Sequence, residues 1–542
     1  MDHDSRAGHR RAVAGLWTRD RAKGTLSHMM TSVLQRVTVS SSLIVGGLVL
    51  MTTAPASAAV CTSGVEGDVN GDGYAEVAVS EAGRTYGKGA VHVFYGRPKG
   101  LAAAKSGTAL DDQYLDQAEP GVAGSSSDYE QFGSGVAFGD YNDDGCADLA
   151  VGATAQSNSG SLFIFYGSKA GLRTTGSTRI TYEQLLGAPG TPIDQGFGYI
   201  LQAGDLNDDG VTDLALGVPV RPVGDSDGRG TVAVLLGGSG GLSTTQKLVL
   251  DRSSAGIPAG EGEVGKTLAI GDFDGNGIQE LAIAYGDGLV QIVEGTSGGL
   301  VPSQGPLTGP SLGIDDFIPD HDGEGEYRVF GDIMVAGDVD ADGRDDLAVG
   351  MPAKGLGGSV AVVKGSSSGL TAAGVTTWDQ GDTGVVGTPE EDDSFGASLA
   401  MGRLDAGPTD DLAIGVPYDT IDGKRGAGSA IILLGSSSGL TTAGQGGARY
   451  HQNSPGVPGT AELQDVFGRA LTIANVQSRT QGSLIIGAPR EKIGTIDATG
   501  QFHQLSIMAS GPRTSGSTAF NLDSTGVRGA SRKEAELGRA LD

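Results

Sequence analysis

Five stretches of this chain place oxygen-bearing side chains at alternating positions of a short loop. They begin at Asp68, Asp140, Asp205, Asp272 and Asp338, and the third reads DLNDDGVTDLALGVP. Asp or Asn stands at loop positions one, three and five, Gly at six, and Asp or Glu at nine, before a hydrophobic run. Hard oxygen donors around a sharp turn suit a hard divalent cation and select Ca²⁺ over Zn²⁺.

We predict that each loop offers one ion three side-chain oxygens, the carbonyl oxygen of residue seven and the carboxylate of residue nine. The predicted ligands are Asp68, Asn70, Asp72, Tyr74 and Glu76; Asp140, Asn142, Asp144, Cys146 and Asp148; Asp205, Asn207, Asp209, Val211 and Asp213; Asp272, Asp274, Asn276, Ile278 and Glu280; and Asp338, Asp340, Asp342, Arg344 and Asp346. The alternative is a solvated Asn/Asp turn without metal, but five copies in one frame favour calcium. About five structural Ca²⁺ ions are expected, with affinities of the order of 10⁻⁴–10⁻³ M.

The loops belong to a longer repeat that predicts the elements around them. An aromatic–glycine pair, most often Phe-Gly, stands eight residues before most loops, and a hydrophobic run follows each loop. A second apolar run, a turn ending in Gly-Leu and a further extended segment complete the unit. Four short strands per repeat are typical of one β-propeller blade.

Seven such frames can be counted. The last two loops begin at Arg403 and Asn475 and have lost most of the acidic ligands. The first frame has no aromatic–glycine strand before it, whereas AELGRALD, ending at Asp542, matches DVFGRALTI at 465–473. We therefore predict an all-β fold over 59–542, a seven-bladed β-propeller of four-stranded blades closed by the C-terminal strand. The alternative is an open tandem array, which would not require that one blade be supplied by both ends of the chain.

The repeat resembles the FG-GAP repeat, whose family forms the β-propeller of integrin α-subunits and occurs in secreted bacterial proteins. Its second signature is Gly-x-Pro after the loop strand, as at 217–219 and 350–352. The resemblance runs from about Val65 to the end and implies that the face opposite the calcium loops binds a ligand. No von Willebrand-type insertion interrupts the repeats and no leg-like domain follows them, so we expect only the head-like ring to be shared.

The first 58 residues have a different character. Basic residues precede the apolar stretch SSLIVGGLVLMTTAPASAAV, in which Ala56-Ser57-Ala58 is a small-residue cleavage site. This pattern predicts a secretory signal peptide over 1–58. We expect a secreted protein, free or associated with the cell surface, and no other segment is apolar enough to span a bilayer.

Charge and cysteine content narrow the function classes further. The net charge is −28 and the isoelectric point about 4.5, which disfavours binding to nucleic acid or anionic membrane. The mature chain contains two cysteines, Cys61 and Cys146. An even pair in an exported protein predicts a disulfide, and the alternative is two unpaired thiols.

Patterns that suggest catalysis are weaker. Gly-x-Ser-x-Gly, the pattern of serine hydrolases, occurs at 237–241, 295–299, 365–369 and 435–439. All four copies occupy the same hairpin of the repeat, so we interpret them as turns. His92 alternates with valines and is expected to be exposed. Acids around His321 predict a solvated loop, with a sixth cation site as the alternative.

The expected function is a binding or adhesion module for an extracellular protein or glycan, acting as a monomer and not as an enzyme. Longer loops on the face opposite the acidic loops carry aromatic side chains, which either contact the ligand or pack under the loops. They are Trp378, Tyr418, Tyr450, His451 and Tyr182. The alternatives are a propeller associated with a secreted hydrolase or lyase, and a structural envelope protein.

Overall fold

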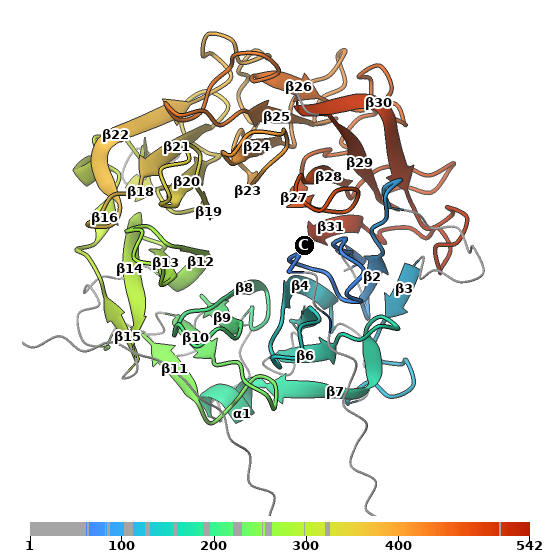
Figure 1. The fold of residues 1–542 in the computed structure, drawn as a ribbon. Helices are drawn as coiled ribbons and strands as arrows, with labels where there is room; N and C mark the ends of the chain where they lie inside the picture. The colour runs from blue at the N-terminus through green and yellow to red at the C-terminus, as the bar shows by residue number, and fades with distance from the viewer. Residues whose placement is uncertain are drawn as a thin grey trace, which may run out of the picture. The chain divides into compact units, whose positions relative to one another are not determined.

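The computed structural model describes residue 61 and residues 64–542, except 82, 84–86, 102–111, 125–129, 155–159, 188–195, 220–229, 252, 255–262, 297–298, 320–325 and 509–510. The predicted signal peptide and His321 lie outside this part of the chain. The described residues form seven antiparallel blades around a central axis (Figure 1), which confirms the predicted all-β propeller. Among them, no helix is long and apolar enough to cross a bilayer.

Each blade is numbered by the acidic loop it contains, and its strands are given from the axis outward. Blade one contains β31 (Leu537–Leu541), β1 (Val77–Glu81), β2 (Ala90–Phe94) and β3 (Asp112–Leu115). Blade two contains β4 (Phe132–Gly139), β5 (Asp148–Ala153), β6 (Ser161–Tyr166) and β7 (Arg173–Thr181). Blade three contains β8 (Ile200–Gly204), β9 (Asp213–Val218), β10 (Thr231–Leu235) and β11 (Lys247–Leu250).

The remaining four blades repeat this order. Blade four contains β12 (Val264–Gly271), β13 (Glu280–Tyr285), β14 (Leu289–Thr296) and β15 (Gly299–Pro302), with β16 (Leu307–Thr308) also paired to β14. Blade five contains β19 (Ile333–Gly337), β20 (Asp346–Met351), β21 (Ser359–Lys364) and β22 (Thr371–Trp378). Blade six contains β23 (Ser398–Gly402), β24 (Asp411–Val416), β25 (Ser429–Leu433) and β26 (Ala448–Tyr450). Blade seven contains β27 (Ala470–Ala474), β28 (Ser483–Ala488), β29 (Gln501–Met508) and β30 (Gly511–Phe520).

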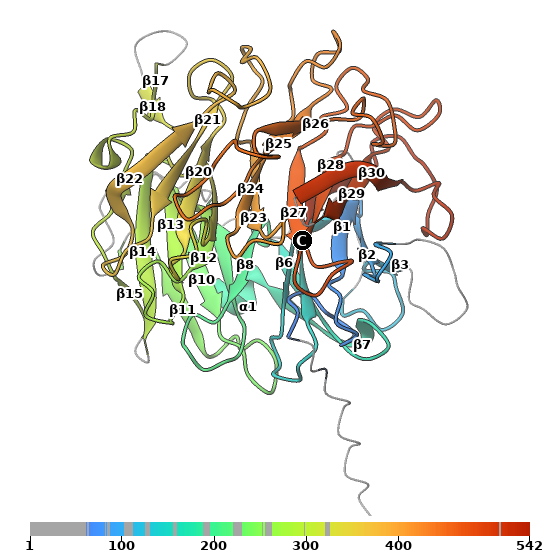
Figure 2. The same cartoon turned by 45° about the horizontal axis from the view of Figure 1, so that its top comes forward.

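Three small elements lie outside the blades. The helix α1 (Tyr182–Leu186) follows β7, and the 3₁₀ helix η1 (Pro310–Leu312) follows β16. A hairpin of β17 (Phe317–Pro319) and β18 (Glu326–Arg328) projects from one end of the ring (Figure 2). β18 leads into the start of β19, the innermost strand of blade five, whereas acidic loops two to five follow the ends of the innermost strands. The hairpin therefore lies at the end of the ring opposite the acidic loops.

The second strand of each blade is buried on both faces. Strands such as β5 (DLAVGA) and β20 (DLAVGM) contain six buried residues each. One face packs on the preceding blade and the other on the next, so the strand is apolar throughout and shows no polar alternation. The core therefore consists of hydrophobic layers between blades; one such layer unites Leu149 of blade two with Val91 of blade one.

The two glycine signatures of the repeat meet where neighbouring blades touch. Gly152 lies within β5, the strand that follows the second loop. A Cβ atom there would overlap the carbonyl oxygen of Gly198, from the aromatic–glycine pair of the next blade. The same contact joins Gly487 to Gly538, and both pair glycines have positive φ, 85° and 87°. Only glycine permits this close approach and this backbone conformation together, which explains why both signatures recur.

The C-terminal strand closes the ring. β31 pairs antiparallel with β1, and backbone hydrogen bonds join Ala78 and Asp542 in both directions at 2.8 and 3.2 Å. Leu537 stands where five of the other six blades have Phe, and it is fully buried. The predicted division of blade one between the two ends of the repeat region is thus confirmed.

The predicted disulfide is also present. Cys61 and Cys146 are bonded, with their Cα atoms 4.8 Å apart and a sequence separation of 85. Cys61 packs directly on Gly71 of the first acidic loop, while Cys146 belongs to the second. The bond therefore ties two neighbouring loops to each other and to the segment that precedes blade one.

The expectation for His92 was wrong. Its side chain is fully buried, with Nδ1 3.3 Å from Asp112 and Nε2 3.5 Å from Glu81. Burial opposes the charged imidazole, but these two carboxylates outweigh it and raise the pKa of His92 to about 9. The alternation of β2 places His92 against a neighbouring blade, because a blade buries both of its faces.

The aromatic residues expected on the opposite face are mostly not exposed there. Tyr450 is buried, Trp378 is half-buried against the layer between blades five and six, and Tyr182 packs edge-on against Phe197. Tyr418, at 41% exposure, is the member of the set that projects into solvent. For the others, the alternative of packing under the loops holds.

Candidate metal centres

Loops two to five connect the innermost strand of a blade to its second strand, and loop one directly precedes β1, the second strand of blade one. The five loops therefore lie at one end of the ring. In the first loop, Oδ1 of Asp68 accepts hydrogen bonds from the backbone N–H groups of Asn70, Gly71 and Asp72 at 3.2, 2.6 and 3.2 Å. Its Oδ2 accepts from Gly73 at 2.7 Å. The first residue of the loop thus wraps the following backbone around its own carboxylate.

Loops two to five repeat this arrangement. The N–H of residue six donates to Oδ2 of residue one at 2.8–2.9 Å, in the pairs Gly145–Asp140, Gly210–Asp205, Gly277–Asp272 and Gly343–Asp338. The backbone has positive φ at position six of every loop, between 81° and 92°, as the glycine there predicts. Each loop also has positive φ at position four, where Gly71, Asp143, Asp208, Gly275 and Ala341 stand.

The carboxylates of three loops converge closely enough to share a cation. Ligand atoms lie within 4.8 Å of one another in the groups Asp68, Asp72 and Glu76; Asp272, Asp274 and Glu280; and Asp338, Asp340 and Asp342. Loops two and three contain the same hydrogen-bond frame. The structure thus brings together three of the predicted carboxylates in each of loops one, four and five, whereas the acids of loops two and three form no such group among the described residues. The role of the residue-seven carbonyls, from Tyr74 to Arg344, stays a prediction.

Glu76 supplies an independent sign that a cation fits. The side chain is 1% exposed, and Oε2 accepts a hydrogen bond from the N–H of Val69 at 2.7 Å. Its Oε1 atom is buried without a hydrogen-bond partner among the residues that the structure describes. A buried carboxylate close to two other carboxylates is costly unless a cation balances it, so the residues present fit a hard metal ion.

The carboxylates at position nine have raised pKa values. Burial raises the pKa of Asp148 to about 8, and the neighbouring carboxylates Asp144 and Asp140 add to this rise. Burial and neighbouring acids likewise raise the pKa of Glu280 to about 7 and that of Asp213 to about 6. In the absence of a cation, the ionised loops therefore oppose folding.

This gives a pH prediction for the metal-free protein. Because these pKa values are higher in the folded chain than in the unfolded one, their stabilising contribution is complete below about pH 4 and is lost as the pH rises through 6–8. We expect the melting temperature in EDTA to fall between pH 5 and pH 8. In millimolar calcium, which favours the ionised carboxylates, this fall should be smaller or reversed; equal slopes with and without calcium would contradict the assignment.

Residues at position eight hold the loops in place, and sequence reasoning missed them. The side chains of Asp345 and Asp410 accept hydrogen bonds from the backbone N–H groups of Asp272 and Asp338 at 2.9 and 3.1 Å. Gln279 does the same for Asp205 at 2.9 Å. Each of these three side chains thus anchors the first residue of the acidic loop in the preceding blade. The sequence contains a signal for this role, because a polar residue stands directly before position nine in loops four, five and six.

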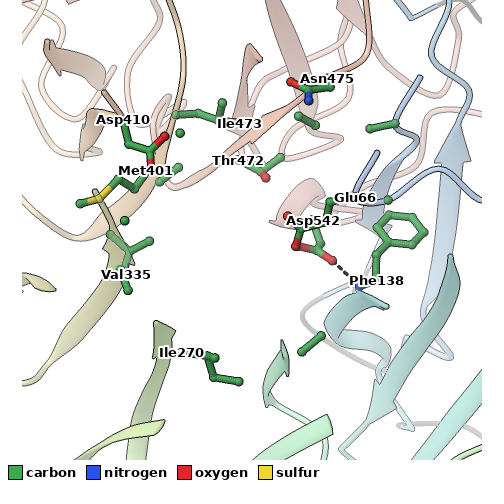
Figure 3. Close-up of a pocket in the computed structure, with 18 of the residues that line it drawn as sticks. Glu66, Phe138, Ile270, Val335, Met401, Asp410, Thr472, Ile473, Asn475 and Asp542 are labelled. Carbon is green, nitrogen blue, oxygen red and sulfur yellow. Dashed lines mark hydrogen bonds between the residues drawn. The ribbon is translucent and has the colours of Figure 1, made fainter. Parts of the chain in front are cut away.

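A cavity of about 800 Å³ lies on the axis of the ring (Figure 3). The innermost strands line it with residues such as Ile270, Val335 and Met401. The carboxylate of Asp542 accepts a hydrogen bond from the N–H of Phe138 at 2.5 Å across the closing blade, as Figure 3 shows. This side chain supports ring closure.

Loops six and seven keep the frame with few of the ligands. Asp411, at position nine of loop six, still accepts from the N–H groups of Leu404 and Gly435 at 2.7 and 2.8 Å. Arg403 replaces the first acid. In loop seven, Arg479 donates to the carbonyl of Asp72 in loop one at 2.9 Å. The position-nine carboxylate therefore has a structural role even without metal ligands around it.

Comparison with known proteins agrees with this architecture. The FG-GAP repeat family matches residues 62–94, 132–165 and 197–235, which span loops one to three. Phosphatidylinositol-glycan-specific phospholipase D of Bos taurus is 31% identical over 201 residues, covering 34% of this chain and 22% of that protein. Integrin alpha-5 of Xenopus laevis is 30% identical over 253 residues, covering 44% of this chain and 21% of that protein.

The chain thus spans about a fifth of the length of these relatives. Among solved structures, Saccharomyces cerevisiae Sqt1 matches over 84% of this chain with 10% identity and a TM-score of 0.38, which carries no argument. The repeat matches coincide with the first three acidic loops of the seven-bladed ring. The chain therefore contains FG-GAP repeats set in a β-propeller and is similar in sequence to part of integrin α-subunits.

Proposed function

We propose that this chain is an extracellular binding module whose propeller is stabilised by calcium in its acidic loops. The supporting observation is the buried carboxylate of Glu76, which lies close to the carboxylates of Asp68 and Asp72. The same loop frame recurs in blades two to five. The calcium ions are proposed to be structural, because each acidic loop leads directly into the second strand of its blade.

The proposed ligand surface is the end opposite the acidic loops. Exposed apolar side chains gather in loops at this end of blades five to seven: Leu356 is 58% exposed, Tyr418 41% and Leu463 68%. Tyr418 and Gln464 both lie within 4 Å of the Cβ position at Gly426, so the loops carrying Tyr418 and Leu463 are neighbours. An aromatic and an aliphatic side chain beside exposed charged pairs such as Arg425–Asp392 suit a protein or glycan ligand.

The test is to probe the purified protein against glycan and matrix-protein arrays with calcium and with EDTA. We expect at least one ligand that binds only in calcium. Tyr418→Ala should weaken this binding about tenfold, the effect of losing one interface hot spot. Val249→Ala, equally exposed on the outermost strand of blade three, is the control. Binding unaffected by Tyr418→Ala would place the ligand elsewhere.

The relative named phospholipase D supports a second candidate, a propeller that serves a secreted hydrolase. Only 22% of that protein aligns with this chain, so its activity cannot be transferred by similarity alone. Hydrolysis of phosphodiester or ester substrates by the purified chain would favour this candidate over the binding module. An extracellular location is proposed for both, supported by the disulfide and by the integrin relatives.

A further inference from the structure

On the third strand of each blade, one residue lies directly opposite loop position nine, and its side chain is charged in some blades and neutral in others. In blade four, Glu280 at loop position nine is paired directly with Glu294 on the adjacent strand. The register of the other blades places a different residue opposite position nine in each. They are Tyr95 in blade one, Tyr166 in blade two, Leu236 in blade three and Lys364 in blade five.

Lys364 reaches into the fifth loop. Its Nζ atom lies 2.8 Å from Oδ2 of Asp340 and 3.0 Å from Oδ2 of Asp346, which are the side chains at loop positions three and nine. The lysine side chain is 16% exposed. An ammonium group therefore lies between two of the carboxylates that would otherwise face a calcium ion.

No other acidic loop in the described part of the chain has such a contact on its position-nine carboxylate. In loops one to four, the oxygen corresponding to Asp346 Oδ2 accepts from the N–H of residue two, namely Val69, Tyr141, Leu206 or Phe273. In loop two, Arg173 approaches Asp144 at 3.7 Å from a position that is 46% exposed. Arg173 therefore pairs with the residue at position five, and no ion pair with Asp148 at position nine is seen among the described residues.

An ammonium and a calcium ion compete for the same oxygens. The lysine ammonium is a compact charge with three donors, so it can neutralise two carboxylates at hydrogen-bond distance. A calcium ion bound to the same two carboxylates would lie close to Nζ, and like charges at that distance repel strongly. The lysine is attached to the adjacent strand and is present at every calcium concentration.

We propose that Lys364 is the built-in cation of the fifth loop, so that calcium fills loops one to four and leaves loop five to the lysine. This inference rests on the proposed calcium function and reduces the expected number of ions by one.

The first test counts bound calcium ions by native mass spectrometry in millimolar calcium. Lys364→Met removes the charge and keeps a long side chain, and we expect it to bind one more ion than the unaltered protein. Adding Asp340→Asn should remove that extra ion. Lys354→Met, which breaks a lysine–carboxylate pair with Asp315 outside the loops, should leave the count unchanged.

A second readout does not depend on metal. In EDTA, Lys364→Met should melt at a lower temperature than the unaltered protein, because Asp340 and Asp346 lose their counter-charge, and calcium should restore the difference. If the unaltered protein loses an ion on Asp340→Asn, loop five binds calcium and the inference is wrong, although the calcium function stands. If no chain binds calcium, the proposed function fails. Equal melting of Lys364→Met and the unaltered protein in EDTA would then overturn the role of the lysine as well.

Discussion

Deletion of residues 530–542 should yield a chain that aggregates and melts far below the intact propeller. The deletion removes β31, so the edge of β1 loses its partner strand and its backbone hydrogen bonds to Asp542. Leu537 leaves the hydrophobic layer that it shares with Val77 and Phe502. An unpaired edge next to an opened core favours association between chains. Thermal unfolding and light scattering of the truncated and intact proteins measure this effect.

A point substitution separates loss of the strand from loss of chain length. Leu537→Ala empties a fully buried site at the closing blade and should lower the free energy of unfolding by about 2–5 kcal/mol. Leu463→Ala is the control, since Leu463 is 68% exposed and its truncation should have no measurable effect on stability. If the truncated chain and Leu537→Ala both melt like the intact protein, β31 does not hold the ring closed.

Removal of calcium should lower the melting temperature, and its return should restore it. A ligand that binds only the folded state stabilises by mass action, which at affinities of 10⁻⁴–10⁻³ M amounts to roughly 0.4–1.4 kcal/mol per site in 1 mM calcium. Four or five sites together would contribute a large part of the stability of a typical domain. Thermal unfolding in EDTA and in millimolar calcium measures the total.

A matched pair of substitutions assigns this effect to the loops. Asp274 in loop four and Asp405 in loop six both stand at position three, and each accepts one backbone hydrogen bond, from Asn276 at 2.9 Å and Gly407 at 2.6 Å. In EDTA, Asp274→Ala and Asp405→Ala should therefore cost similar amounts. In calcium, Asp274→Ala should show a smaller calcium-induced rise in melting temperature, whereas Asp405→Ala should keep the full rise. Equal rises in both variants would exclude loop four as a calcium site.

The parts of this structure that repeat were the parts that the sequence could predict. The loop frame, the seven blades and the closing strand each follow from local patterns that occur several times, such as the match between the end of the chain and 465–473. The glycine contacts between blades, such as Gly152 on Gly198, explain these patterns physically. The disulfide between Cys61 and Cys146 was predictable because no other cysteine competes for either partner.

The missed features depend on neighbours that sequence order does not reveal. His92 follows a period of two, which normally exposes every second residue, but a propeller blade buries both faces. Lys364 lies 18 residues from Asp346 and meets it only through the register of β20 and β21. Trp378 and Tyr450 read as loop aromatics, yet they end outer strands and pack inward. In each case the deciding contact is made across strands or between blades.

The most direct test of the calcium assignment is the position of metal in a crystal grown with calcium. Calcium scatters anomalously, so its positions appear as peaks in an anomalous difference map. We predict peaks within loops one to four, each beside the side-chain oxygens of positions one, three, five and nine, and no peak in loops six and seven. Absence of peaks from the acidic loops, or equal peaks in all seven frames, would contradict the claim that these loops are calcium sites.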